Sequence, residues 1–241
     1  MKKELLSLAL LTGLVVAPTF TKADENKTVD GNVTLKTPTT APLDPPDIEP
    51  PVGPYDPSNE LLRISAVTPL DFGNVTLTSS LMKPVAQLFS SEGKDYYPGV
   101  LVEDLRGTGT GWNLTVGLST FAETTEGGEL KENGNTLKGV QLVFPTNVTP
   151  ETVSDSGIVV SNVQPEYTAG RLEANGNGTH RLLSAGIDRG MGAWQVSFAP
   201  KDQEEAGLTA QPLTLEIPAN NKIGSYQSTI TWTVADGPTA P

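Results

Sequence analysis

Hydrophobic residues alternate with small or polar residues in three separate stretches of the chain, and each stretch contains one of its three tryptophans. The stretches are residues 112–118, 194–198 and 226–234. A period of two is typical of a β-strand with one buried face. We therefore expect three strands, distant in sequence, to bring Trp112, Trp194 and Trp232 into one common core.

Further short apolar runs follow one another between clusters of Gly, Pro and Asn, and no stretch keeps the apolar spacing of an amphipathic helix over three turns. The polar, Gly-rich segments 122–135 and 165–179 are predicted to be loops. The pattern predicts an all-β protein, an immunoglobulin-like antiparallel β-sandwich over residues 58–241. The additional predicted strands are 61–66, 70–77, 85–89, 100–105, 137–144, 158–160, 180–185 and 213–217.

The N-terminal residues 1–23 have the features of a secretory signal peptide. Lys2 and Lys3 form a basic start, residues 5–17 form an apolar run, and a small-residue cleavage site ends at Ala23. The apolar run is too short to span a bilayer core of about 30 Å. We expect export with cleavage after Ala23.

Residues 24–57 have the composition of a linker. Eight prolines lie between Pro38 and Pro57, with four acidic residues among them. Proline fixes φ and removes main-chain donors, so this stretch favours an extended polyproline II conformation. Its apolar content is too low for a core of its own. We predict a disordered acidic spacer, with a short docking motif for a partner as the alternative.

The predicted mature chain is strongly acidic and has no cysteine. It carries 13 Lys and Arg against 27 Asp and Glu, a net charge of −14. This charge opposes binding to nucleic acid, to anionic membranes and to anionic wall polymers. Binding to a wall would therefore depend on short-range contacts. Without cysteine, disulfides and thiol chemistry are excluded.

Motifs for catalysis or for a cofactor are absent from the sequence. His180 is the only histidine, no Gly-x-Ser-x-Gly elbow is present, and one histidine alone cannot build a zinc site. The run Gly107–Gly111 lacks the Lys-Ser/Thr ending of a phosphate loop and leads into a strand. Among the carboxylates, Glu103 and Asp104 are adjacent, so a strand points them to opposite faces. We predict no enzyme activity, no cofactor and no metal, with a glycosidase carboxylate pair as the remaining alternative.

At Trp112-Asn113-Leu114 and at Trp232-Thr233-Val234 the chain resembles the WxL family of Gram-positive surface proteins. The glycine-rich stretch 190–192 before Trp194 matches the family's middle segment. Val234 departs from the leucine usual in the second motif. Of the other matched positions, we treat five as supporting site residues: Asp104, Arg106, Gly111, Trp194 and Tyr226.

The resemblance implies a protein that is secreted, stays at the cell surface and binds the cell wall without a covalent bond, with peptidoglycan as the ligand. It also implies companion surface proteins of the same system, one of them anchored in the membrane. The last residues before Pro241 contain no sorting pentapeptide or hydrophobic tail. We therefore expect the domain itself to hold the protein at the wall.

Two alternatives stay open at this point. The motif tryptophans either build the core or stack on a sugar ring. If they build the core, loops or exposed faces near Asp104, Arg106 and Asn113 would meet the wall. For function, the alternative to direct wall binding is an adhesive or structural subunit that docks mainly to companion surface proteins, for example by adding a strand to an exposed edge.

Overall fold

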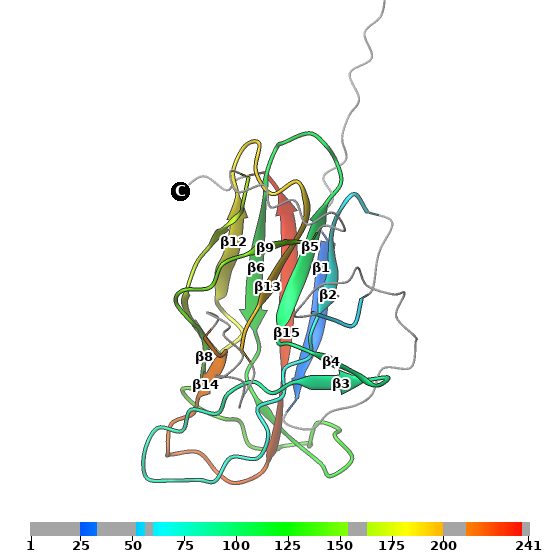
Figure 1. The fold of residues 1–241 in the computed structure, drawn as a ribbon. Helices are drawn as coiled ribbons and strands as arrows, with labels where there is room; N and C mark the ends of the chain where they lie inside the picture. The colour runs from blue at the N-terminus through cyan, green and yellow to red at the C-terminus, as the bar shows by residue number, and fades with distance from the viewer. Residues whose placement is uncertain (1–24, 33–51, 56–59, 154–162, 200–210, 238–241) are drawn as a thin grey trace, which may run out of the picture.

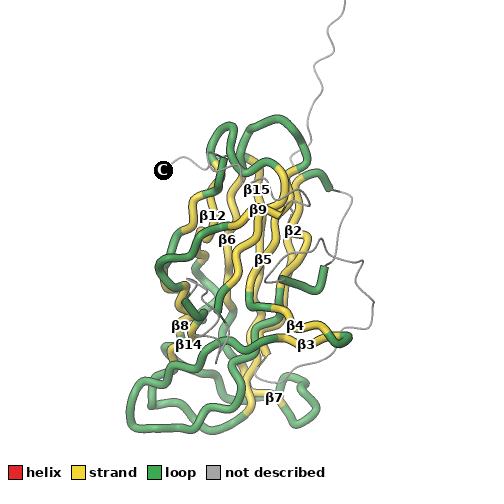
Figure 2. The backbone as a smooth tube through the Cα atoms, viewed as in Figure 1, coloured by secondary structure: helices red, strands yellow, loops and turns green. Residues whose placement is uncertain are grey.

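The computed structural model describes residues 25–32, 52–55, 60–153, 163–199 and 211–237. All regular elements in these ranges are β-strands, and all their pairings are antiparallel (Figure 1, Figure 2). No helix in this part of the chain is long and apolar enough to cross a membrane. The prediction of an all-β fold with antiparallel sheets is therefore confirmed.

The largest sheet joins strands from both ends of the chain. Its strand order is β1-β15-β6-β12-β10, and β7 pairs with the first residues of β15. The central pair of β6 and β15 places Trp232 opposite Val116 and Val234 opposite Leu114. The members of this sheet are β1 (Glu25–Asn32), β6 (Trp112–Leu118), β7 (Ala122–Thr124), β10 (Glu166–Tyr167), β12 (Thr179–Ala185) and β15 (Ser225–Asp236).

The remaining strands form one four-stranded sheet, one three-stranded sheet and a hairpin. Their orders are β2-β5-β13-β9, β11-β8-β14 and β3-β4. The four-stranded sheet contains β2 (Leu62–Val67), β5 (Gly99–Asp104), β9 (Glu151–Val153) and β13 (Gly192–Ser197). The other strands are β3 (Phe89–Ser91), β4 (Lys94–Tyr96), β8 (Gln141–Phe144), β11 (Gly170–Glu173) and β14 (Thr214–Glu216).

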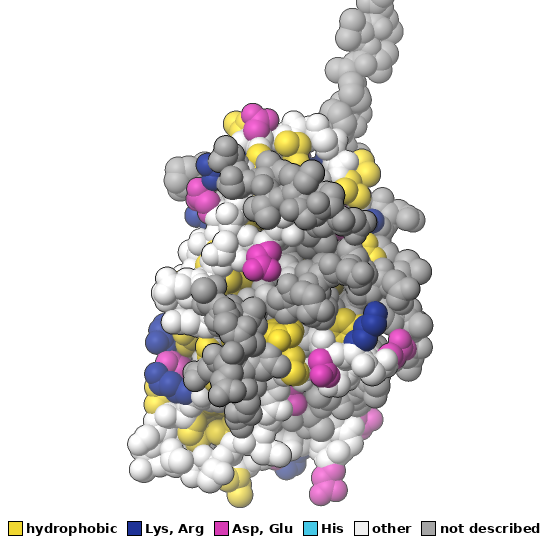
Figure 3. Space-filling view, in the orientation of Figure 1, with side chains coloured by type: hydrophobic (Ala, Val, Ile, Leu, Met, Phe, Trp, Pro, Cys, Tyr) yellow, Lys and Arg dark blue, Asp and Glu magenta, His cyan; other side chains and the backbone are white. Residues whose placement is uncertain are grey.

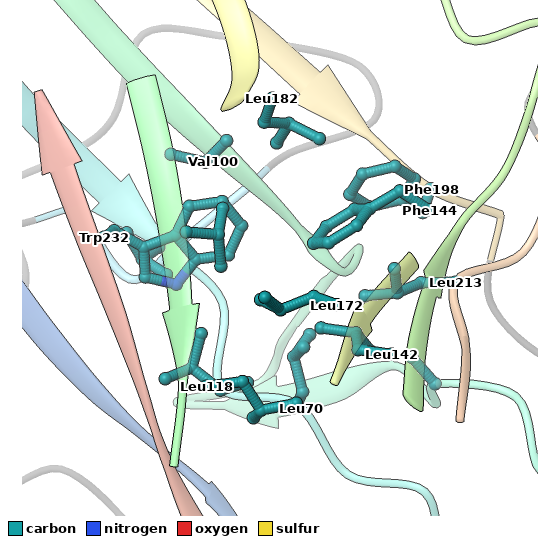
Figure 4. Packing of buried hydrophobic residues seen from close by; sticks show 14 of the residues in the cluster. Leu70, Val100, Leu118, Leu142, Phe144, Leu172, Leu182, Phe198, Leu213 and Trp232 are labelled. Carbon is teal, nitrogen blue, oxygen red and sulfur yellow. The ribbon is translucent and has the colours of Figure 1, made fainter. Parts of the chain in front are cut away.

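The core lies between the largest sheet and the four-stranded sheet, which face each other in Figure 1. Alternation along β6 and β15 turns their large apolar side chains inward. Figure 4 shows Trp232 and Val100 directed into this interior. Trp112, Trp194 and Trp232 belong to one core cluster, and none is more than 2% exposed. The prediction of a common core around three tryptophans is confirmed.

Two segments of the predicted linker belong to the folded part, which corrects that prediction. Residues 25–32 form β1, which pairs with β15 through its main chain, so its polar sequence gave no sign of a strand. Residues 52–55 cover the outer face of β5, where Val52 packs with Leu101 and Ala66. Residues 33–51, like the predicted signal peptide, lie outside the described residues.

The strand prediction at 70–77 is wrong, because the chain turns after two buried residues. Leu70 and Phe72 are in the core. The Asp71 carboxylate then accepts the Gly73 main-chain N–H over 2.8 Å, and Gly73 has a positive φ of 65°. A side-chain turn of this kind competes with strand geometry. The exposed residues beyond it form a loop instead of a strand.

The loop predictions are wrong in part, and one predicted strand cannot be compared. β7 lies within 122–135, and β10 and β11 lie within 165–179. These strands are two to four residues long, which is too short for an alternating pattern to stand out. The predicted strand 158–160 lies outside the described residues.

Candidate functional site

Residues of the first motif and of the glycine-rich stretch before Trp194 meet at one end of the sandwich, although they are far apart in sequence. Trp112, the first residue of β6, lies opposite Asp236 of β15 and Ala185 of β12. On the facing sheet, Asp104 at the end of β5 lies opposite Gly192 at the start of β13. We call this region the motif end; it is the upper end of the molecule in Figure 1.

Trp112 is fully buried and hydrogen-bonded to the glycine-rich loop. Its Nε1–H donates to the Gly190 carbonyl oxygen over 2.8 Å. Gly190 has a positive φ of 72°, and a Cβ built there would lie 2.6 Å from Trp112 Nε1. Only glycine fits between the indole and the backbone here. The indole thus fixes the path of the loop over residues 186–191.

Arg106 ties three chain segments together at the motif end. Its Nε and Nη2 donate to the two carboxylate oxygens of Asp104 over 2.8 Å each, and Nη2 also donates to the Gly111 carbonyl oxygen over 2.8 Å. Nη1 donates to Asp236. The Asp104 side chain is 0% exposed, so its charge depends on this partner. Arg106 thereby joins the end of β5, the loop before β6 and the end of β15.

The contacts around Arg106 shift the pKa values of Arg106 and of Asp236. The hydrogen bonds to Asp104 raise the pKa of Arg106, against the opposing effect of burial. For Asp236, burial acts to raise the pKa, but hydrogen bonds from Arg106 and Thr110 hold it below the usual value. Arg106 and Asp236 are therefore both charged at neutral pH, and we call the ion pairs of Arg106 with Asp104 and Asp236 the clasp.

Asn113 is buried and serves as a second internal connection. Its Nδ2 donates to the Gly237 carbonyl oxygen, and its Oδ1 accepts the Ser184 hydroxyl over 2.9 Å. Gly237 N–H in turn donates to the Gly111 carbonyl oxygen over 3.1 Å. Sequence alternation alone would put Asn113 on an open face. The structure instead uses it to hold the chain after β15 against β6 and β12.

The second motif lies in the middle of the core and away from the loops. Trp232 and Val234 are buried on the inner face of β15, and Leu114 lies beside them on β6. No acceptor for Trp232 Nε1 is found among the described groups. Thr233 is half-buried on the outer face, where its hydroxyl donates to the Asn26 side-chain oxygen over 2.9 Å. The two motifs are therefore joined by packing and do not share a cleft.

Of the supporting residues, the structure brings Trp194 to the motif end and places Tyr226 elsewhere. Trp194 Nε1–H donates to the Met191 carbonyl oxygen over 3.0 Å, within the same glycine-rich loop. Tyr226 lies near the start of β15, at the opposite end of the strand, and its hydroxyl donates to the Lys222 carbonyl oxygen over 3.1 Å. Tyr226 is thus not part of the motif-end site.

Four exposed apolar side chains lie at the motif end, outside the buried contacts of Trp112 and Arg106, and the sequence analysis did not identify them. Their exposed fractions run from 37% to 72%, and Figure 3 shows hydrophobic side chains gathered at this upper end. Main-chain hydrogen bonds fix their loops, since Leu105 N–H donates to Leu61 O over 2.7 Å and Asp188 N–H to Gly109 O over 2.8 Å. We call them the apolar crown: Leu61, Leu105, Ile187 and Met191.

A cavity of about 220 Å³ opens at the opposite end, and it was also missed by the sequence analysis. Its inner wall includes the buried rings of Phe72, Phe121 and Tyr226. Val75, Leu77 and Ile223 stand at its mouth with 38% to 83% of their surface exposed. Its walls come from several separate loops together with β14 and β15, a combination that pairwise sequence patterns do not indicate.

The buried carboxylates outside the motif end are all engaged by cations or donors. Glu103 accepts hydrogen bonds from Arg63 and Ser65, Glu123 from Lys131, and Glu216 pairs with Lys83. Within the described residues, no three His, Cys, Asp or Glu side chains are grouped so that they could hold a metal ion. These three buried carboxylates therefore act as structural ties.

Comparison with protein-family models gives one match, to the WxL domain surface cell wall-binding family, over residues 22–238. The chain belongs to the WxL family. Comparison with curated proteins gives no match, and neither does comparison with solved structures. The match covers nearly the whole chain, so both the motif end and β1 lie inside the WxL domain.

Membership in the WxL family makes this chain a surface protein of the cell wall-binding class. The family is one of non-catalytic binding domains. In this WxL domain both motif tryptophans lie in the interior. The loops 105–111 and 186–191 form the surface next to Trp112.

Proposed function

We propose that this WxL domain attaches the protein non-covalently to peptidoglycan through the motif end. The observation that carries the proposal is that buried contacts of Trp112 and Arg106 hold together the loops at the motif end. Trp112 and Arg106 fix the loops 105–111 and 186–191 by hydrogen bonds to main-chain carbonyls. A rigid loop surface lowers the entropy cost of binding an extended polymer. The protein would be exported through its signal peptide and held at the wall by this surface.

The burial of the tryptophans supports a structural role for them in wall binding, without direct contact with the ligand. Trp112 and Trp232 expose at most 1% of their surface, so a sugar could reach their rings only if the core opened. Opening a core around an indole costs several kcal/mol. The apolar crown and the hydroxyls of the exposed residues Thr108 and Thr110, in the loop 105–111, are better placed for direct contact with a ligand.

The charge of the protein supports short-range contacts of this kind. The predicted mature chain carries a net charge of −14, which opposes long-range attraction to anionic wall polymers. Aliphatic side chains such as Leu105 and Ile187 add no charge and can pack on the C–H faces of a glycan. The crown can therefore bind where general electrostatic attraction cannot.

Sedimentation of the purified chain with stripped peptidoglycan tests the proposal. Leu105→Asp and Ile187→Asp remove apolar contacts and add repulsion, and each is expected to weaken binding by about tenfold or more, with melting temperatures unchanged. Ile223→Asp is the matched control, because Ile223 is an exposed aliphatic residue at the opposite end. Unchanged binding of both crown variants would defeat the proposal.

A second candidate function is docking to companion surface proteins, including a membrane-anchored one, as an adhesive or structural subunit. The apolar mouth of the cavity near Phe121 and Ile223 favours it, because exposed apolar surface around a pocket marks interaction sites. If the purified chain does not sediment with peptidoglycan on its own, and Ile223→Asp releases it from intact cells, docking to companions is the main function.

A further inference from the structure

β1 covers an edge of the largest sheet that would otherwise be open. It pairs along β15 from Glu25 opposite Val234 to Asn32 opposite Gln227. The other side of β15 is occupied by β6 and β7. Without β1, this long strand would present a row of unpaired main-chain N–H and C=O groups, which is a template for another strand. β1 therefore fills a site that any strand able to pair in this register could fill.

The sequence of β1 is polar and carries little information that would select one partner strand. Its sequence has one large aliphatic residue, Val29, among eight. Asn26 is exposed and Lys27 is half-buried, and Asn26 contacts β15 by accepting a hydrogen bond from Thr233. Register and partner are weakly specified in strands that are polar on both faces, and such strands are prone to swapping between molecules.

The chain between β1 and the rest of the domain is long enough for such an exchange. Nineteen residues, 33–51, separate Asn32 from Val52. They can span at most about 60–70 Å, whereas a twelve-residue strand such as β15 measures about 40 Å. Val52 can therefore stay packed on its own β5 while β1 reaches the edge of a neighbouring molecule.

We propose that β1 is exchanged between copies of this chain, so that the β15 edge of one copy receives β1 from another. A second copy offers the same edge and the same eight-residue register, so no new contact has to be created. The inference goes beyond wall binding and does not depend on it. Because a tether of nineteen residues gives an effective concentration on the order of mM, pairing within one chain prevails in dilute solution and exchange at high density.

The absence of cysteine makes the exchange directly testable. Thr28 lies opposite Thr231 in the register, so cysteines at these positions can form a disulfide only when the two strands pair. One preparation, the chain from Asp24 onward, carries Thr28→Cys and a second carries Thr231→Cys. They are mixed at high concentration, oxidised and separated without reductant. We expect a mixed disulfide dimer that increases with concentration.

The matched control replaces Thr231→Cys by Gln227→Cys. Gln227 is half-buried on the same face of β15 but pairs with Asn32, about 13 Å along the strand from the Thr28 partner. Exchange is supported if the mixed dimer with Thr231→Cys exceeds that with Gln227→Cys at least about fivefold, beyond random collision. Equal amounts, or no mixed dimer with either, would overturn the proposal.

A single chain carrying both Thr28→Cys and Thr231→Cys gives a second readout. Oxidised in dilute solution, it closes within one molecule, and we expect it to stay monomeric when concentrated until reductant is added. Concentration-dependent dimers of the closed form would place the contact elsewhere and refute the exchange. Sedimentation of the same closed form with peptidoglycan reports wall binding separately, so failure of one proposal is not read as failure of the other.

Discussion

Trp112 donates its indole N–H to the carbonyl oxygen of Gly190, a residue 78 positions further along the chain, over 2.8 Å. This hydrogen bond connects the first residue of β6 with the loop that precedes β13. Both partners are buried or tightly packed, so the bond is shielded from competing water. The shape of the surface at the motif end therefore depends on an interior contact.

Gly190→Ala should destabilise the domain markedly. The new Cβ would lie 2.4 Å from the Ala185 Cβ and 2.6 Å from Trp112 Nε1, and the positive φ adds strain. We expect a loss on the order of 3 kcal/mol in the free energy of unfolding, measured in urea. Gly192→Ala is the control, since Gly192 also has a positive φ but no neighbour within 4 Å of the added atom. It should cost only about 1–2 kcal/mol, and equal losses would show that crowding at Trp112 is unimportant.

Replacing the two motif tryptophans by phenylalanine should have unequal effects. Trp112→Phe loses the hydrogen bond to Gly190, whereas Trp232 Nε1 has no acceptor among the described groups, so Trp232→Phe loses only packing. We expect Trp112→Phe to be the more destabilising by about 1 kcal/mol in denaturant unfolding. Each variant should also be tested for wall sedimentation. Loss of binding without loss of stability would instead assign the indole a direct contact with the ligand.

Arg106→Ala should be far more costly than the loss of a surface arginine. It leaves the Asp104 carboxylate, which is 0% exposed, without its cation, and such an unpaired buried charge costs about 3–5 kcal/mol. Arg171→Ala is the control, because Arg171 is half-exposed and its partner Glu216 keeps Lys83. We expect only a small loss of stability there, because water screens an exposed ion pair. Similar melting temperatures for the two variants would argue against the clasp.

Stability should decrease in acid as Glu123 loses its charge. Hydrogen bonds from Lys131, and then from the main chain and side chain of Asn135, lower the pKa of Glu123 from 4.5 to about 2. A carboxylate with a depressed pKa stabilises the folded state above its unfolded pKa, and this contribution is lost as the pH falls from about 4.5 towards 2. Melting temperatures of the wild type and of Glu123→Gln should therefore differ at pH 6 and converge near pH 2. A constant difference across this range would contradict the assignment.

The sequence predicts those parts of the fold in which side-chain alternation reports burial directly. β6 and β15 each bury one face, so their period of two identified the strands and placed Trp112 and Trp232 inside. Asp104 and Asn113 could not be placed in this way. Both are polar residues whose partners alternation does not reveal: Arg106, two residues further along, turns back onto Asp104, and the pairing of β6 with β12 brings Ser184 beside Asn113.

Strands that are held mainly by main-chain pairing leave no alternating pattern of apolar and polar residues in the sequence. β1 is polar and was predicted to be part of the linker, because its attachment to β15 depends on backbone groups that every residue has. The apolar crown and the cavity were missed for a related reason. Exposed residues such as Ile187 and Ile223 look alike in sequence, and only the folded arrangement of the loops gives each of them its neighbours.

β15 runs without interruption from Ser225, beside the cavity, to Asp236, in the Arg106 clasp. A twelve-residue strand measures about 40 Å and is stiffened by hydrogen-bonded neighbours on both sides. One strand thus sets the spacing between the two exposed apolar regions of the molecule. If the motif end faces the wall, a partner bound at the mouth of the cavity is held at a constant distance from the envelope. The domain then works as a spacer of fixed length.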